Sequence, residues 1–286
     1  MITTTRFAPS PTGPLHLGHA YAAWVAHDIA IANHGRFLLR IEDIDQSRAR
    51  PEWERQIYDD LAWLGLSWEK PVLRQSDRFE EYDQALDILW RRDLLYPCTC
   101  NRRDILEAAS APQEGGTPIT GPDGLIYPGT CRAKPKPNER PKDLALRLDL
   151  ARALQPPAYH FVEEGEGPTG QTGEITVSCQ ALHQNVGDVV LSRRDMGTSY
   201  HLAVVLDDAA QDVSHVTRGS DLFDATQIHV VLQDLLGLHT PIYHHHRLIR
   251  DAQGKRLAKR DDARALRKFR DDGLCVSDIR SMVGLT

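Results

Sequence analysis

The chain has 286 residues, of which 41% are hydrophobic and 26% charged, so it can fold around one large core or two linked modules. Its formal net charge of −6 argues against a protein that coats nucleic acid indiscriminately, because such binding relies on many phosphate contacts. The N-terminus is polar, with no apolar leader, and no uncharged apolar run is long enough to span a bilayer. We therefore expect a globular, cytoplasmic protein without a membrane segment.

The first part of the chain has the pattern of a doubly wound α/β fold with a parallel sheet. A strand is expected over 4–8, then a proline-rich loop, a helix over 18–33 and a second strand over 36–41. Gly35 stands where a left-handed residue would end the helix. The second strand leads into an acidic cluster, and ligands of open α/β sheets bind at such carboxyl ends.

The rest of the chain alternates between helical and strand-like segments around one insertion. Helices are expected over 51–64, closed by Gly65, and over 77–92, and further elements over 144–150, 186–191 and 200–208. We predict four parts: the first half of a Rossmann-like core at 1–95, an inserted cysteine-rich module at 96–140, the second half of the core at 141–246, and a nucleotide loop with a short helical C-terminus at 247–286.

Three of the five cysteines, Cys98, Cys100 and Cys131, bound the inserted segment. An odd number of cysteines in a chain of this length indicates metal binding or free thiols rather than a disulfide framework. Three thiolates and one further ligand would make a closed tetrahedral zinc site that holds a module with a thin core. Three free cysteines remain the alternative.

The C-terminal segment is basic although the whole chain is acidic. Residues 247–280 contain 11 Lys and Arg against 6 Asp and Glu, a balance of about +5. Such a surface could hold a phosphate backbone, but charge alone favours the simpler interpretation of a solvated helical face.

The most informative segment is the sequence RFAPSPTGPLHLGH at 6–19, between the first strand and the first helix. ATP needs cationic or N–H donors around its phosphates, and a helix start supplies N–H groups with a favourable dipole. Gly18 would let a nucleotide approach the backbone, and His16 and His19 can donate hydrogen bonds to phosphate. Two histidines three apart are by themselves more typical of a surface or a metal site, but the proline-rich context distinguishes this pair.

This segment resembles the HIGH signature of class I aminoacyl-tRNA synthetases, in the form typical of the glutamyl and glutaminyl branch. The second signature of that class, a KMSKS-like loop, is matched by RLAKR at 256–260. The resemblance implies that Lys259 stabilises the leaving pyrophosphate and that Arg256 also contacts ATP. The family usually has lysine in place of Arg256 and serine in place of Ala258, and arginine preserves the charge of lysine but not its geometry.

The same resemblance implies a pocket for glutamate. Arg6 and Ser10 match the family's arginine and serine that contact the amino acid, and Glu42 matches the carboxylate that binds its ammonium group. Tyr200 and Arg218 match a tyrosine and an arginine that line the pocket. By residue type alone, Tyr200 would be a core aromatic and Arg218 a surface ion-pair partner.

The resemblance also supplies a fourth metal ligand and the catalytic residues. In the family a tyrosine four residues before the last cysteine completes the zinc site, and Tyr127 occupies that position. The implied catalytic residues are His16, His19 and Lys259, acting on ATP that carries Mg²⁺, with one structural zinc ion per chain. The histidines at 244–246 precede the loop, and we expect a structural role near the nucleotide pocket.

The acceptor is inferred from the short segment beyond the KMSKS-like loop. Glutamyl-tRNA synthetases continue into large helical anticodon-binding domains, which we do not expect in the two dozen or so residues after Asp262. The chain resembles the glutamyl-Q tRNA(Asp) synthetases, which activate glutamate with ATP without needing tRNA. They transfer it to the queuosine base at the wobble position of tRNA(Asp).

The implied partners are L-glutamate, ATP and the anticodon stem-loop of queuosine-containing tRNA(Asp), bound by a monomer. Two alternatives stay open at this point. One is a truncated glutamyl-tRNA synthetase that charges tRNA(Glu), and the other is a non-catalytic paralogue that has kept the fold as a binding module.

Overall fold

The computed structural model describes residues 2–109, 120–250 and 265–285. The strands are β1 (Thr4–Phe7), β2 (Arg36–Ile41), β3 (Leu73–Arg74), β4 (Leu95–Cys98), β5 (Thr120–Gly121), β6 (Gly124–Leu125), β7 (Ala145–Leu148), β8 (Ala158–Glu163), β9 (Gly173–Ser178), β10 (Val190–Ser192), β11 (His215–Gly219) and β12 (Ile242–His246). The helices are α1 (Leu17–Ala32), α2 (Pro51–Trp63), α3 (Phe79–Arg91), α4 (Arg102–Ala109), α5 (Leu150–Ala153), α6 (Cys179–Asn185), α7 (Tyr200–Ala210), α8 (Thr226–Leu236), α9 (Leu266–Asp271) and α10 (Val276–Met282), with 3₁₀ turns η1 (Gln75–Arg78) and η2 (Ser220–Leu222).

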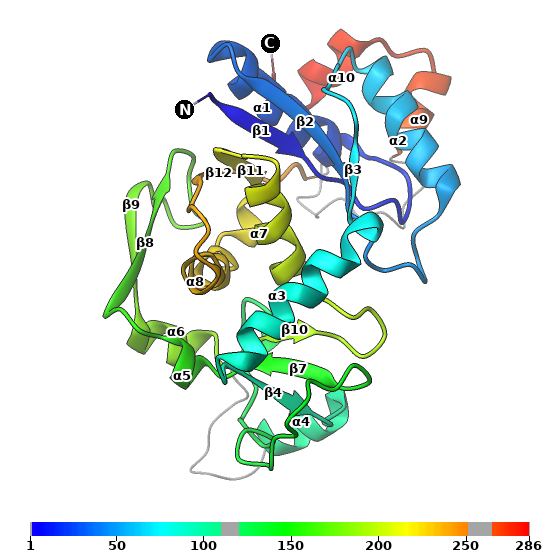
Figure 1. Ribbon diagram of the computed structural model, residues 1–286. Helices are drawn as coiled ribbons and strands as arrows, with labels where there is room; N and C mark the ends of the chain where they lie inside the picture. Colours follow the sequence, from blue (N-terminus) through cyan, green and yellow to red (C-terminus); the bar gives the residue numbers. More distant parts are fainter. Residues whose placement is uncertain (1, 110–119, 251–264, 286) are drawn as a thin grey trace.

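The central sheet is built in two hydrogen-bonded parts. Strands β1, β2 and β3 are parallel, and so are β11, β12 and β8, with β9 antiparallel at the outer edge. The two parts meet along β1 and β11, where the Ser214 N–H donates to the Thr4 carbonyl at 3.0 Å and the Thr4 N–H donates to Ser214 Oγ at 2.8 Å. The predicted parallel α/β fold is confirmed, and the junction of β1 and β11 is a place where side chains from both halves can meet (Figure 1).

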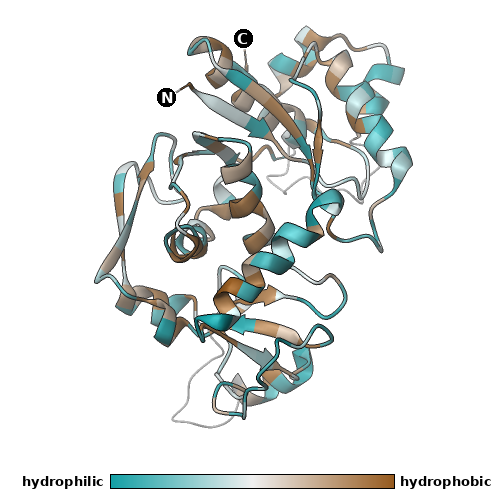
Figure 2. Cartoon of the chain, in the orientation of Figure 1, coloured by the Kyte–Doolittle hydropathy of each residue, from teal (hydrophilic) through white to brown (hydrophobic). Residues whose placement is uncertain are grey.

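Two apolar cores hold the molecule together. One joins α1, β1, β2 and α2 to the C-terminal helices through residues such as Trp24, Leu61 and Ile279. The other joins α3, β7, α7 and α8, with Leu86, Leu148 and Val231 fully buried. Strand β2 and helix α7 are hydrophobic over most of their length, as expected for elements buried between layers (Figure 2).

One predicted helix end is confirmed and one is wrong. Gly65 has φ of +78°, as predicted for the residue that closes α2. After α1, however, the left-handed residue is His34, with φ of +50°, not Gly35. Gly35 is needed for a different reason, since a Cβ atom there would lie 2.0 Å from the Thr3 carbonyl oxygen.

The inserted region has a sheet of its own. Strands β4, β7 and β10 pair antiparallel, so this sheet draws strands from both sides of the predicted boundary at residue 140. A small cluster under it contains Tyr96, Cys98, Tyr127 and Cys131. No helix in the described ranges is long and apolar enough to cross a membrane.

Candidate functional site

The two histidines of the first signature are held by the backbone at the start of α1. His16 is the N-cap residue, and its Nδ1 accepts the Gly18 N–H at 3.1 Å, while Nδ1 of His19 accepts the His16 N–H at 3.1 Å. An imidazole whose Nδ1 accepts carries its proton on Nε2. The capping arrangement therefore fixes both neutral rings as Nε2–H donors.

The geometry gives Gly18 a second reason to be glycine. A Cβ atom at this position would lie 3.0 Å from Cε1 and 3.1 Å from Nδ1 of the His16 ring. The His16 and His19 rings are themselves close, with centroids 3.8 Å apart. A side chain at position 18 would push against the capping imidazole as well as against any nucleotide near the helix start.

Residues 251–264, which contain Arg256 and Lys259, lie outside the described residues. Ala265, the first residue after this segment, forms an isolated antiparallel bridge with His16. The Leu266 N–H also donates to the Leu15 carbonyl at 2.8 Å. Ala265 and Leu266 therefore lie directly beside the first signature.

The carboxyl ends of β1 and β2 bring Ser10 and Glu42 into one region. The Glu42 N–H donates to the Pro9 carbonyl at 3.1 Å, which ties the loop after β1 to the residue after β2. The Glu42 carboxylate lies 3.3 Å from Nη2 of Arg40. Burial raises the pKa of Glu42, against the lowering effect of the Arg40 and Arg6 charges.

Arg6 and Arg40 share one buried carboxylate across the junction of β1 and β11. Asp208 on α7 accepts Arg6 Nε at 2.9 Å and Arg40 Nη1 at 2.7 Å, and Arg6 Nη1 donates to the Thr217 carbonyl at 2.9 Å. Burial opposes ionisation of Asp208, but the charges of Arg40 and Arg6 hold its pKa below the ordinary value. Sequence reasoning missed Arg40 and Asp208, although a charged residue inside the apolar strand 37–41 is a signal of a buried ion pair.

Tyr200 and Arg218 reach the same region from α7 and β11. The Tyr200 ring lies 5.7 Å, between centroids, from the ring of His229, which contacts Arg218, and Arg6 donates to the carbonyl of Thr217, the residue before Arg218. Burial raises the pKa of the Tyr200 hydroxyl, while the charges of Arg218 and Arg6 lower it. Arg218 is only 6% exposed, which excludes the surface ion-pair alternative. The structure therefore brings together four of the five residues predicted to bind glutamate, with Ser10 in the adjoining loop.

Arg218 has neighbours that the sequence did not indicate as site residues. Its guanidinium contacts His229 and Thr226 on α8 and His245 on β12. His245 is one of three consecutive histidines, and the next, His246, lies instead against the ring of Tyr21, with centroids 5.2 Å apart. Only the pairing of β11 with β12 places His245 beside Arg218.

The cysteine cluster has the dimensions of a tetrahedral metal site. The three sulfur atoms of Cys98, Cys100 and Cys131 lie within 4.8 Å of one another, and the Cys100 and Cys131 sulfurs are 3.5 Å apart. The Tyr127 hydroxyl lies 3.5 Å from Cys98 Sγ and 3.4 Å from Cys100 Sγ. Ideal Zn–S and Zn–O bonds give tetrahedral edges of about 3.8 Å between sulfurs and about 3.5 Å between sulfur and oxygen, so the donor set fits zinc.

Cationic groups surround these ligands. Arg147 Nε lies 3.3 Å from Cys98 Sγ, and its guanidinium stacks 3.8 Å from the centroid of the Tyr127 ring. Burial disfavours the Cys131 thiolate, but hydrogen bonds from Tyr127 and Thr99 lower the pKa of Cys131 to about 6. The site thus favours at least one thiolate, which is the form that binds metal.

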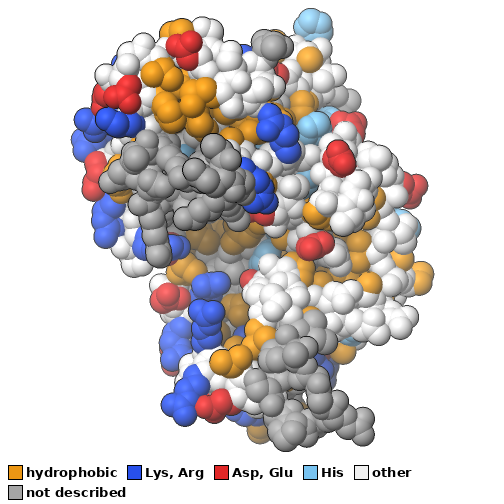
Figure 3. All heavy atoms as spheres, turned by 180° about the vertical axis from the view of Figure 1, so that it is seen from behind, with side chains coloured by type: hydrophobic (Ala, Val, Ile, Leu, Met, Phe, Trp, Pro, Cys, Tyr) orange, Lys and Arg blue, Asp and Glu red, His pale blue; other side chains and the backbone are white. Residues whose placement is uncertain are grey.

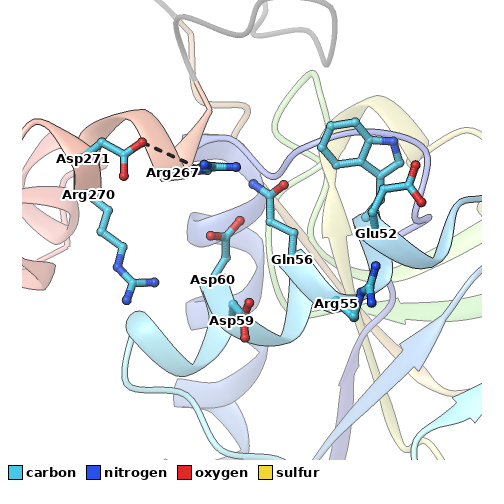
Figure 4. A pocket seen from close by; sticks show the side chains of 9 residues that line it. Glu52, Arg55, Gln56, Asp59, Asp60, Arg267, Arg270 and Asp271 are labelled. Carbon is cyan, nitrogen blue, oxygen red and sulfur yellow. Dashed lines mark ion pairs between the residues drawn. The ribbon is translucent and has the colours of Figure 1, made fainter.

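A separate cavity of about 550 Å³ lies between α2 and α9, and none of the predicted site residues lines it (Figure 4). Its walls mix arginines with carboxylates: Glu52, Trp53, Arg55, Gln56, Asp59, Asp60, Arg267, Arg270 and Asp271. Arg267 and Asp271 form an ion pair of 3.7 Å within it. Asp60 differs from the other carboxylates because it is only 2% exposed and its Oδ2 has no hydrogen-bond partner.

Known proteins resemble this chain over nearly its whole length. The family described as tRNA synthetases class I (E and Q), catalytic domain, matches residues 2–283. The glutamyl-Q tRNA(Asp) synthetase of Rhodobacter capsulatus is 61% identical over 283 residues, which are 98% of this chain and 99% of the relative. This chain belongs to the glutamyl-Q tRNA(Asp) synthetase family. A second family member, from Nitratidesulfovibrio vulgaris, is 38% identical over 98% of this chain and 85% of its own length.

Solved structures of tRNA ligases have a similar fold. A glutamate tRNA ligase from Elizabethkingia meningosepticum, crystallised with its amino acid, superposes with a TM-score of 0.71 at 26% identity. That match covers 96% of this chain but only 54% of the ligase. A methionyl-tRNA synthetase from Mycobacterium tuberculosis, at 11% identity and a TM-score of 0.59, shares the fold.

Proposed function

We propose that this protein activates glutamate with ATP to glutamyl-adenylate, without tRNA, and transfers the glutamyl group to the queuosine base at the wobble position of tRNA(Asp). The observation that carries the proposal is the convergence of Arg6, Glu42, Tyr200 and Arg218 around the junction of β1 and β11. The 61% identity to a glutamyl-Q tRNA(Asp) synthetase over nearly both full lengths supports the same acceptor.

The charges of the pocket suit glutamate. Arg6 and Arg40 contact Asp208, and Arg40 also contacts Glu42, whereas Arg218 contacts no carboxylate in the described part of the chain. The side-chain carboxylate of glutamate would be the direct ion-pair partner of Arg218. Its ammonium group would pair with Glu42 and so favour the ionised form that burial opposes.

In the first step the α-carboxylate of glutamate attacks the α-phosphorus of ATP, and the bond to the β-phosphate breaks to release pyrophosphate. His16 and His19 would donate from Nε2 to phosphate oxygens as charge develops. Lys259, with Arg256, would offset the charge of the leaving pyrophosphate, and Mg²⁺ would accompany ATP. Much of the rate enhancement would then come from positioning and phosphate electrostatics.

In the second step a hydroxyl of the queuosine cyclopentene ring attacks the activated carbonyl, which forms an ester and releases AMP. The anticodon stem-loop would be guided to the adenylate by basic side chains. Lys and Arg side chains gather along one edge of the molecule, above and below a recess, on the face opposite to that of Figure 1 (Figure 3). Backbone contacts of this kind position an RNA loop, while the pocket reads the base.

The cysteine cluster would hold one structural zinc ion through Cys98, Cys100, Tyr127 and Cys131. Zinc would cross-link β4 to the segment after β6 and so stabilise the inserted module. We propose further that the protein acts as a monomer and in the cytoplasm, where its tRNA substrate is found.

The proposal is tested by an acceptor assay with labelled glutamate and three RNAs. We expect labelling of queuosine-containing tRNA(Asp), including a form that lacks its 3′-terminal adenosine, and none of tRNA(Asp) without queuosine. Nuclease digestion should place the label in the anticodon fragment. Efficient esterification of the 3′ end of tRNA(Glu) would instead identify an ordinary glutamyl-tRNA synthetase.

A further inference from the structure

Arg218 is held in the pocket by neutral groups. Its Nε donates to His245 Nε2 at 3.0 Å, Nη1 contacts His229 Nδ1 at 2.9 Å, and Nη2 donates to Thr226 Oγ1 at 2.6 Å. These bonds use three of the five guanidinium N–H groups. One N–H on each terminal nitrogen has no partner within the described part of the chain, and two such donors can bind a carboxylate in bidentate fashion.

The proton positions of the network on the β12 side are set by Arg218. A guanidinium can only donate, so Nε2 of His245 must accept, and the neutral ring carries its proton on Nδ1. That proton points to Glu163 Oε2, 2.5 Å away. The other oxygen of Glu163 accepts the backbone N–H groups of His245 and Gly165, both at 2.8 Å. The carboxylate is thus fixed one imidazole away from the cation.

A second chain leaves Arg218 on the α8 side. Nδ1 of His229 must accept from Arg218, so its Nε2–H donates to Nδ1 of His201 at 3.1 Å. The Nε2–H of His201 then points to Asp123 Oδ1 at 3.4 Å. Both hydrogen-bonded chains therefore run from the Arg218 guanidinium through neutral imidazoles to a distant carboxylate. If His229 or His245 were protonated, an N–H of its ring would face an N–H of Arg218, and the hydrogen bond between them would be lost.

The other two arginines of the pocket are held differently. Arg6 and Arg40 contact Asp208 directly, and Arg40 also contacts Glu42. Arg218 contacts no carboxylate among the residues that the structure describes. Burial and the nearby Arg218 charge lower the pKa of His229 well below its usual value, and burial lowers that of His245. Both imidazoles are accordingly neutral at physiological pH, and they orient the guanidinium without cancelling its charge.

We propose that His229 and His245 are positioning residues that fix Arg218 through neutral acceptors, which leaves its charge for the substrate's side-chain carboxylate and thereby selects glutamate over glutamine. The inference rests on the proposed function, because it takes Arg218 as the partner of that carboxylate. A carboxylate at either acceptor position would pair with Arg218 itself and compete with the substrate. The neutral amide of glutamine gains little from an uncancelled positive charge and offers a single acceptor oxygen.

Two isosteric pairs of variants test the role of charge. The side-chain oxygen of Asn or Asp lies near the position of Nδ1 of histidine, so His229→Asn and His229→Asp both keep an acceptor for Arg218 but differ by one charge. Glutamate-dependent exchange of pyrophosphate into ATP gives KM and kcat for glutamate, and the same assay is run with glutamine. We expect KM for glutamate to be at least about tenfold higher in the Asp variant than in the Asn variant, with a smaller change in kcat and a lower preference for glutamate over glutamine.

His245→Gln and His245→Glu repeat the comparison at the position of His245 Nε2. Thermal unfolding shows whether each variant folds, and the second pair tests the proposal if the first does not fold. Equal KM values and equal glutamate preference within a folded pair would overturn the proposal. Long-range ¹H–¹⁵N spectra of histidine-labelled wild-type protein provide a readout independent of activity. They should show His245 protonated on Nδ1 and His229 on Nε2, and the opposite tautomers would also overturn it. If wild-type protein fails to exchange pyrophosphate with glutamate at all, the proposed function is wrong, while the spectra still test the network.

Discussion

Asp60, on the inward face of α2, is predicted to destabilise the protein at neutral pH. The residue is 2% exposed, and its Oδ2 has no hydrogen-bond partner among the described residues. Burial raises its pKa from 3.8 to about 6, although Arg270 and Arg267 act in the opposite direction. The folded state therefore binds this proton more tightly than the unfolded state, so the free energy of unfolding falls as the pH rises from about 4 to about 6 and stays lower above that.

The size of the effect is set by the difference between the two pKa values. At about 1.4 kcal/mol per pKa unit, the full penalty at pH 8 is about 3 kcal/mol, whereas at pH 4.5 about 1 kcal/mol has developed. Asp60→Asn removes the ionisation and keeps the shape. We expect the free energy of unfolding of the variant, relative to wild type, to be about 2 kcal/mol higher at pH 8 than at pH 4.5. The cost of burying an amide does not depend on pH, so it cancels in this comparison.

Urea unfolding of both proteins at the two pH values measures this difference. Asp59→Asn is the matched control, because the neighbouring carboxylate is exposed and its replacement makes the same change in charge. The control should lie within about 0.5 kcal/mol of wild type at both pH values. The reasoning would be refuted by a stability difference between Asp60→Asn and wild type that does not change with pH, or that is larger at pH 4.5.

Three further predictions concern the site. Lys259→Ala should slow glutamate-dependent pyrophosphate exchange by about 10²-fold or more, because an ammonium is lost where charge develops, and wild-type exchange would remove Lys259 from the mechanism. Protein purified without added zinc should contain about one zinc ion per chain by elemental analysis, and Tyr127→Phe should lose it to a chelator more readily; equal retention would exclude the phenol as a ligand. Asp208→Asn should lower the free energy of unfolding by about 3–5 kcal/mol in urea titrations, because Arg6 and Arg40 lose their shared carboxylate; a loss below about 1 kcal/mol would show that the two cations are solvated.

The sequence by itself determined the local features of this protein. Hydrophobic periodicity and glycine positions predicted β2 over its full length and α2 with its stop at Gly65, since these depend on neighbours in the chain. The cysteine spacing and the motif at 6–19 predicted which side chains gather in the cysteine cluster and at the start of α1. The end of α1 was missed because Gly35 is required by a close approach to Thr3, which lies just before β1 and 32 residues away in the chain.

The tertiary structure alone decided how charge is distributed around the pocket. Arg6 and Asp208 are separated by 202 residues in the chain, and His245 and Glu163 by 82, yet each pair is in contact. No periodicity specifies such pairs, because they depend on which strands become neighbours and in what register. The parallel pairing of β11 with β12 sets His245 rather than His244 or His246 beside Arg218. A shift by one residue would turn a different side chain to the pocket, since successive residues of a strand face opposite sides of the sheet.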